Sequence, residues 1–84
     1  MSLDAKFSDA QVRVKTLTSA PSNEQLLQLY SHFKQATVGD CAGKRPGAFD
    51  FKGRAKYDAW ARLKGQSVDD AKEAYVALVD SLLR

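Results

Sequence analysis

The sequence has few of the residues on which disulfide frameworks, metal sites and most catalytic centres depend. Its 84 residues include one cysteine, Cys41, and one histidine, His32. A single cysteine cannot form an intramolecular disulfide, which favours a reducing compartment. A zinc site needs about four converging ligands, so we expect no metal and no cofactor. A Cys–His nucleophilic pair stays open in principle, although no third residue is in place to orient it.

Long apolar runs are also missing. No run approaches the ~20 residues that a membrane-spanning helix needs, and the first residues, Met-Ser-Leu-Asp-Ala-Lys, contain no apolar stretch of a secretory signal. We therefore expect a cytoplasmic protein without stable membrane insertion. The 44% hydrophobic and 27% charged residues are typical of folded globular proteins. At this length, residues 1–84 are expected to form a single domain.

Apolar residues recur at the three- and four-residue spacing of helices, and no segment alternates as a strand would. The first predicted helix carries one apolar face of Leu3, Phe7, Ala10, Val14 and Leu17. The second opens at Ser22, three residues before Gln25, in the pattern of a capping box, and ends at Gly39. It is expected to bury one stripe, Leu26, Tyr30, Phe33 and Thr37, with Leu27 and Leu29 at its edges.

A loop rich in glycine, proline and basic residues follows, from Gly39 to about Asp50. Long ordered loops in small domains tend to be functional. A third helix is expected from Phe51 to Leu63, with Gly65 as its left-handed cap. Its inward candidates are Ala55, Tyr57, Trp60 and Leu63, and a fourth helix, capped by Ser67, should bury Ala71, Tyr75, Leu78 and Leu82. The sequence thus predicts an all-α protein of four helices.

Positive charge is concentrated in the middle of the chain. Residues 44–64 hold seven basic and two acidic side chains, whereas residues 1–43 hold four of each and residues 65–84 hold two basic and four acidic. Such a segment suits phosphates, nucleic acid or an anionic membrane surface. The alternative is a loop and helix face that are simply solvated.

Aromatic and basic residues share flanks of the predicted helices. Tyr30 and Lys34 lie four residues apart on the second helix, and Lys52 and Lys56 repeat that spacing on the third. Tyr75 lies midway along the fourth helix, and Lys15 lies at the edge of the first apolar face. If these flanks face one cleft, its ammonium groups and two phenols would suit a ligand with phosphates, a ring and an apolar tail. The spacing of residues on separate helices does not show whether these side chains converge. The alternative is that the aromatic residues belong to the core and the lysines form a solvated rim.

Three stretches in the middle of the chain carry a specific set of residues. They are Tyr30-Ser-His-Phe-Lys-Gln-Ala-Thr-Val-Gly-Asp40, Arg45-Pro-Gly47 and Asp50-Phe-Lys-Gly-x-Ala-Lys56-x-Asp-Ala-Trp60-x-x-Leu-Lys-Gly65. Together they resemble the acyl-CoA-binding protein family, and the likeness extends from Phe7 through the last helix. The resemblance implies an up-down-down-up four-helix bundle. It also implies a monomer, not an enzyme, that binds medium- to long-chain fatty acyl-CoA thioesters one to one as an intracellular carrier and pool former.

The resemblance also implies roles for individual residues. Tyr30 and Lys34 match the residues that hold the adenine and the ribose 3′-phosphate. Lys56 matches a lysine at the same phosphate, and Lys52 matches the basic residue one turn earlier. The other implied site residues are Leu26 and Leu27 along the acyl groove, Lys15 at the pocket edge, Tyr75 beside the nucleotide, and Phe33, where the family often has a stacking tyrosine.

Two alternatives from other classes stay open. A nucleic-acid-binding helical module would use residues 44–64, but Asp58 and the large aromatics of the third helix fit poorly with a recognition helix. A helical protein-interaction domain that docks on acyl-CoA-using enzymes is compatible with ligand binding. Departures from the family pattern at Phe33, Tyr57 and Ala20 bear on affinity and on the preferred chain length.

Overall fold

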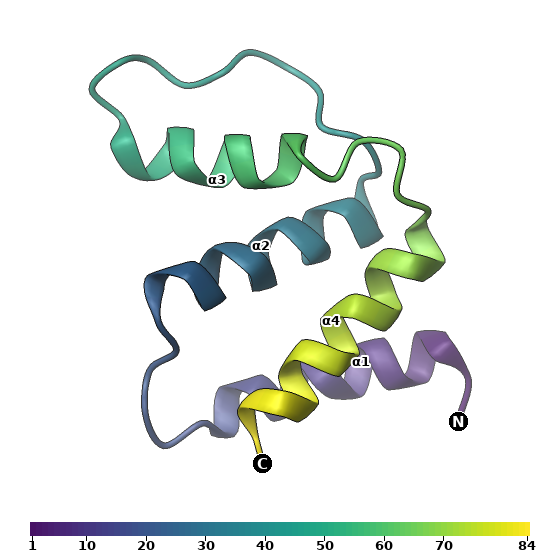
Figure 1. Ribbon diagram of the computed structural model, residues 1–84. Helices are drawn as coiled ribbons and strands as arrows, with labels where there is room; N and C mark the ends of the chain where they lie inside the picture. The colour runs from purple at the N-terminus through teal and green to yellow at the C-terminus, as the bar shows by residue number, and fades with distance from the viewer.

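Four α-helices make up the computed structural model, which describes all 84 residues. They are α1 (Leu3–Arg13), α2 (Asn23–Thr37), α3 (Phe51–Ala61) and α4 (Val68–Leu82), and a short 3-10 segment, Val14–Thr16, follows α1. In Figure 1, α1 and α4 run from right to left, whereas α2 and α3 run from left to right. The prediction of an all-α, up-down-down-up bundle is confirmed. None of the helices has the length and apolar character that crossing a bilayer requires.

Local capping interactions define where the helices begin. The Ser22 side chain accepts a hydrogen bond from the Gln25 N–H at 3.1 Å, and the Gln25 side chain accepts one from the Ser22 N–H at 2.9 Å. Ser67 caps α4 with a single bond, accepting from the Asp70 N–H at 3.0 Å. Gly65 has a φ of +90°, the left-handed conformation expected of it. These three expectations are confirmed.

Two predicted helix ends are wrong by about half a turn or more. The first helix gives way to 3-10 geometry at Val14 rather than running to Leu17. The third ends at Ala61 rather than Leu63, because the Leu63 N–H bonds to the Trp60 carbonyl three residues back, at 3.0 Å. Such tighter bonds commonly close the last turn of a helix.

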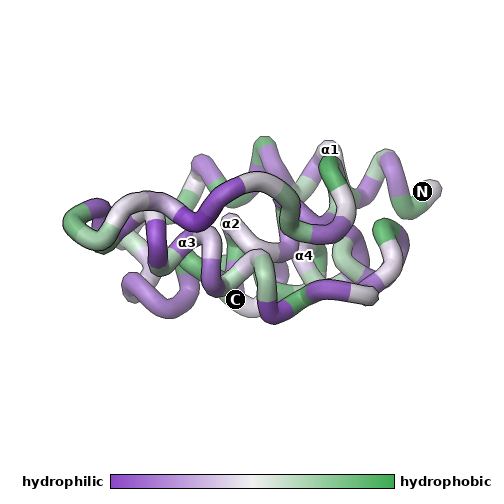
Figure 2. The backbone as a smooth tube through the Cα atoms, turned by 90° about the horizontal axis from the view of Figure 1, so that it is seen from above, coloured by the Kyte–Doolittle hydropathy of each residue, from purple (hydrophilic) through white to green (hydrophobic).

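The molecule is flat, with principal extents of 40 × 29 × 15 Å. A helix with its side chains is about 10–12 Å across, so the shortest extent is little more than one layer of helices. Helix α2 occupies the middle, packing against α4 on one side and α3 on the other, and α1 packs against α4. Only 10 of the 84 residues are buried in consequence, and hydrophilic and hydrophobic segments mix along the tube of Figure 2.

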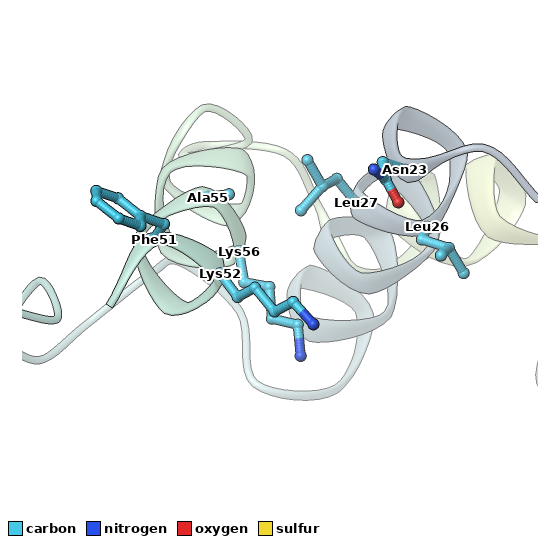
Figure 3. Close-up of a pocket in the computed structure, with 7 residues that line it drawn as sticks. All are labelled: Asn23, Leu26, Leu27, Phe51, Lys52, Ala55 and Lys56. Carbon is cyan, nitrogen blue, oxygen red and sulfur yellow. The ribbon is translucent and has the colours of Figure 1, made fainter. Parts of the chain in front are cut away.

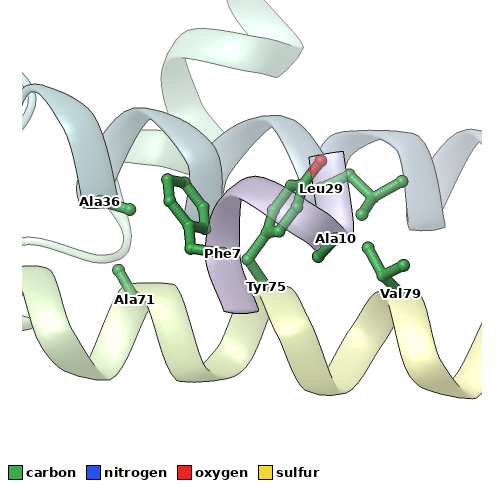
Figure 4. Close-up of a cluster of buried hydrophobic side chains, with 7 residues drawn as sticks. All are labelled: Phe7, Ala10, Leu29, Ala36, Ala71, Tyr75 and Val79. Carbon is green, nitrogen blue, oxygen red and sulfur yellow. The ribbon is translucent and has the colours of Figure 1, made fainter. Parts of the chain in front are cut away.

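The buried core lies between α1, α2 and α4 (Figure 4). Its members are Phe7 and Ala10 from α1, Leu29 and Ala36 from α2, and Ala71, Tyr75 and Val79 from α4. The rings of Phe7 and Tyr75 meet edge to face with centroids 5.2 Å apart, a favourable aromatic geometry. Helix α3 contributes nothing to this cluster, so its position depends on α2 and on the loop before it.

The prediction of which α2 residues are buried is wrong. Leu26 is 47% exposed, Thr37 is exposed, and Tyr30 and Phe33 are only half-buried. Helix α2 instead turns Leu29 and Ala36 toward α1 and α4, and Leu27 and Ser31 toward α3. Because successive helical residues are about 100° apart, the expected stripe lies between these two contact surfaces. Phe33 packs against the edge of the core, and Leu26 and Thr37 remain accessible.

Side chains of α3 hold the long loop in place. Asp58 accepts two hydrogen bonds from the Arg45 guanidinium, at 3.0 and 2.7 Å, and Arg45 thereby lowers the pKa of the Asp58 carboxyl. Trp60 donates its indole N–H to the Gly39 carbonyl at 2.8 Å. Arg54 and Tyr57 bond to further loop carbonyls at 2.9 to 3.0 Å. The loop and α3 therefore form one ordered unit.

A second set of hydrogen bonds joins the end of α2 to the turn before α4. The buried Gln35 side chain donates to the Asp40 carboxylate at 2.8 Å and to the Gln66 carbonyl at 2.9 Å. The same Asp40 oxygen accepts from the Gly65 N–H at 2.8 Å. The Gly65 N–H and then the Gln35 amide hold the pKa of the Asp40 carboxyl below its usual value.

Candidate functional site

A cleft of about 420 Å³ lies between α2 and α3, a volume within the range of small-molecule sites. Its lining residues are Asn23, Leu26 and Leu27 from α2 and Phe51, Lys52, Ala55 and Lys56 from α3. In Figure 3, Leu27 points toward α3, and the side chains of Lys52 and Lys56 extend side by side toward α2. The cleft thus joins an apolar floor to two ammonium groups.

Two lysine–aromatic pairs bridge α2 and α3 in opposite directions. The Lys56 Nζ of α3 lies 5.3 Å from the centroid of the Tyr30 ring on α2. The Lys34 Nζ of α2 lies 4.9 Å from the Trp60 ring on α3. Both distances are within the range of cation–π attraction. The structure therefore brings together four predicted residues, Tyr30, Lys34, Lys52 and Lys56, along one seam, with Leu26 and Leu27 in the same cleft.

Three predicted site residues lie away from the seam between α2 and α3. Tyr75 is 6% exposed and packs in the core, where burial raises the pKa of its phenol. Phe33 is half-buried beside it, with ring centroids 6.3 Å from Tyr75 and 6.1 Å from Phe7. Lys15 is exposed in the 3-10 segment after α1. These residues face the α1 and α4 side of α2 or lie beyond it, so they do not line the space beside α3.

The sequence argument missed several residues of the seam. Phe51 and Ala55 lie one turn apart on α3, each next to a cleft lysine, and their spacing could have placed them on that flank. Asn23 stands one turn before Leu27 on α2 and could have been found in the same way. The contact of Lys34 with Trp60 had no such signal, because the two residues belong to different helices.

A second cleft of about 350 Å³ shares Leu27 and Ala55 with the first, but its charges differ. Its other lining residues include Glu24, His32, Asp58 and Arg62. Burial lowers the pKa of His32, and its Nδ1 has no hydrogen-bond partner. Since acidic and basic groups are mixed here, this cleft has no electrostatic preference for an anion. The first cleft has two lysines and no carboxylate, so it favours an anion.

Comparisons with known proteins agree with this architecture. A family model described as "Acyl CoA binding protein" matches residues 4–79. The acyl-CoA-binding protein homolog 1 of Caenorhabditis elegans is 56% identical over 77 residues, which is 92% of this chain and 90% of that protein. The acyl-CoA-binding protein of Saccharomyces cerevisiae is 47% identical over 92% of this chain and 88% of its own.

Solved structures show the same likeness. The crystal structure of Oryza sativa acyl-CoA-binding protein 2 has a TM-score of 0.92 and 41% identity, covering 98% of this chain and 91% of its own. That of the Moniliophthora perniciosa protein has a TM-score of 0.89 and 41% identity, over 99% of this chain and 81% of its own. Because the matches in sequence and in structure each span nearly the whole molecule, this chain belongs to the acyl-CoA-binding protein family.

Proposed function

We propose that this chain binds one medium- to long-chain fatty acyl-CoA thioester and carries it in the cytoplasm as a monomer, without transforming it. Membership of the acyl-CoA-binding protein family supports the ligand class. The observation that carries the proposal for this site is the seam between α2 and α3, where lysines, aromatic rings and an apolar cleft adjoin. An acyl-CoA needs these three environments for its phosphates, its adenine and its acyl chain.

The phosphates would meet lysines that have no acidic partner within the chain. All four ion pairs of the structure use other side chains: Arg13 with Asp9 and with Asp80, Arg45 with Asp58, and Lys72 with Asp4. Lys34, Lys52 and Lys56 therefore keep their charge available for an external anion. Each charge-assisted hydrogen bond to a phosphate would contribute about 1.5–3 kcal/mol, and Tyr30 offers a ring face to the adenine.

The acyl chain would lie on the apolar floor of the cleft. Leu26 and Leu27 from α2 face Ala55 from α3 across it, and Leu26 is half exposed without ligand. Transfer of an acyl chain from water to such a surface stabilises the complex by roughly 0.8 kcal/mol per buried CH₂. Affinity should therefore rise with chain length until the cleft is filled.

Binding without turnover is supported by the chemistry of the lining. Its charged residues are Lys52 and Lys56, and it contains no histidine, thiol or carboxylate to act on the thioester. A carrier of this kind needs to release its ligand, and acyl-CoA-using enzymes are the partners that would receive it.

Isothermal titration calorimetry with palmitoyl-CoA tests the proposal, with free CoA and palmitate as separate titrants. We expect one-to-one binding of the thioester and far weaker binding of either half, because each half occupies only part of the seam. Lys34→Gln and Lys56→Gln should each weaken binding about tenfold or more and leave thermal unfolding nearly unchanged. Lys6→Gln on α1 is the matched control. Failure to bind any chain length, or an equal loss in the control, would overturn the proposal.

A further inference from the structure

Trp60 is the single tryptophan of the chain and the one buried residue of α3. Its exposed fraction is 8%, yet it takes no part in the core between α1, α2 and α4. The centroid of its ring lies 4.9 Å from the Lys34 Nζ of α2, within the range of cation–π attraction. A large ring that is buried apart from the core, under an ammonium group, indicates a role in holding that group.

Hydrogen bonds tie the Trp60 ring to the end of the helix that carries Lys34. The indole N–H donates to the Gly39 carbonyl at 2.8 Å. The N–H groups of Val38 and Gly39 both donate to the Lys34 carbonyl, at 2.8 and 3.3 Å. The ring and the lysine backbone are therefore held to each other through the turn that ends α2, although the two residues belong to different helices.

The ring restrains the Lys34 ammonium group without neutralising it. A carboxylate in the same place would pair with the cation and oppose its binding of an anion, whereas a ring face carries no net charge. The ion pairs of the structure all use other side chains. A lysine side chain loses considerable rotamer entropy when it is fixed, and the ring restrains this one before any ligand arrives. Lys34 is accordingly half-buried, whereas Lys52 and Lys56 are exposed.

We propose that Trp60 is a positioning residue of the site and holds the Lys34 ammonium group ready for a phosphate of the ligand. This role rests on the proposed function, since it needs an anionic ligand at the seam. A group that is ordered beforehand binds more tightly, because less entropy is lost on binding. The other pair differs, because Tyr30 is half-buried and Lys56 is exposed. An adenine would take the place of Lys56 on the Tyr30 ring, whereas the buried Trp60 ring keeps its lysine.

A double-mutant cycle, with the affinity for palmitoyl-CoA measured by calorimetric titration, tests this proposal. We expect Trp60→Leu to weaken binding about three- to tenfold, and Trp60→Phe, which keeps a ring, to weaken it less. In a Lys34→Gln background neither change should weaken binding further, because the group that the ring positions is absent. Tyr57→Phe is the matched control on α3. It also removes a hydrogen bond to the loop, but no lysine lies over its ring, so its effect should be the same in both backgrounds.

The fluorescence of the single tryptophan tests the contact without any change to Trp60. In the ligand-free protein, Lys34→Gln should shift the emission maximum, because it removes a charge from the ring face, whereas Lys52→Gln should leave the emission unchanged. An unchanged emission in Lys34→Gln would overturn the proposal, and so would equal weakening by the Trp60 variants in both backgrounds. If Trp60→Leu does not fold, Trp60→Phe completes the cycle. Failure of the proposed function is distinct from these results, because the unaltered protein would then bind no palmitoyl-CoA.

Discussion

The hydroxyl of Tyr75 can be tested separately from its ring. The ring is part of the core, edge to face with Phe7 at 5.2 Å and 6.3 Å from Phe33. The hydroxyl sits at the far end of a side chain that points from α4 toward α2 (Figure 4), and it makes no hydrogen bond within the chain. The oxygen is not among the buried polar atoms without a partner, so it is open to an external partner. If Tyr75 lies beside the nucleotide, as the family resemblance implies, that partner is the ligand.

The change Tyr75→Phe keeps the ring and removes only the oxygen. Since no intramolecular hydrogen bond is lost, the free energy of unfolding should change by less than about 1 kcal/mol. Tyr75→Ala would instead remove a large core ring, at a cost of about 3–5 kcal/mol, and could not separate the two roles. Loss of one hydrogen bond to a charged ligand group weakens binding by about 1.5–3 kcal/mol, roughly ten- to a hundredfold in affinity.

The assay pairs two measurements on the purified variant. Urea unfolding gives its stability, and calorimetric titration with palmitoyl-CoA gives its affinity. We expect a nearly unchanged midpoint and an affinity at least tenfold lower. An unchanged affinity with intact stability would refute the inference and leave Tyr75 as a core residue only.

Three further changes test the caps and the hydrogen bonds between elements. Gly65→Ala places a side chain at φ +90°, which should cost about 1–2 kcal/mol, seen as a lower urea midpoint; an unchanged midpoint would contradict a constrained turn. Gly53→Ala would bring its Cβ against the Asp50 carboxylate, so loss of the cap, worth about 1 kcal/mol, should cancel the usual gain in helix propensity of similar size. If urea unfolding instead showed the variant to be more stable by the full gain in helix propensity, the Asp50 side chain would be able to move aside at no cost. The Gly65 N–H and the Gln35 amide lower the pKa of Asp40 in the folded state, so the stability they contribute is complete above the ordinary carboxyl pKa and is lost as pH falls through the lowered one. Unfolding followed from neutral to acidic pH should therefore be less pH-dependent in Asp40→Asn, and equal acid sensitivity would refute the assignment.

Several features of the fold could be predicted because their physical causes are local. The capping box at Ser22, the cap at Ser67 and the left-handed Gly65 each depend on groups within three or four residues of one another. The motifs between Tyr30 and Gly65 resemble one specific family, and that resemblance predicted the order and direction of the helices. Periodicity alone could not have done so, because many helical families share it. Helix ends that depend on tighter last-turn bonds, as at Ala61, were placed less well.

The sequence by itself determined four helices, their starts and a basic middle segment, and the tertiary structure decided which faces are buried and which residues meet. A hydrophobic stripe on α2 was expected to be core, but a helix with neighbours on two sides leaves the surface between them open, and Leu26 stays accessible there. The meeting of Lys56 with Tyr30, and of Lys34 with Trp60, depends on how α3 packs against α2. Spacing along one helix carries no information about the rotation and register of another, so only the folded chain could bring these residues together.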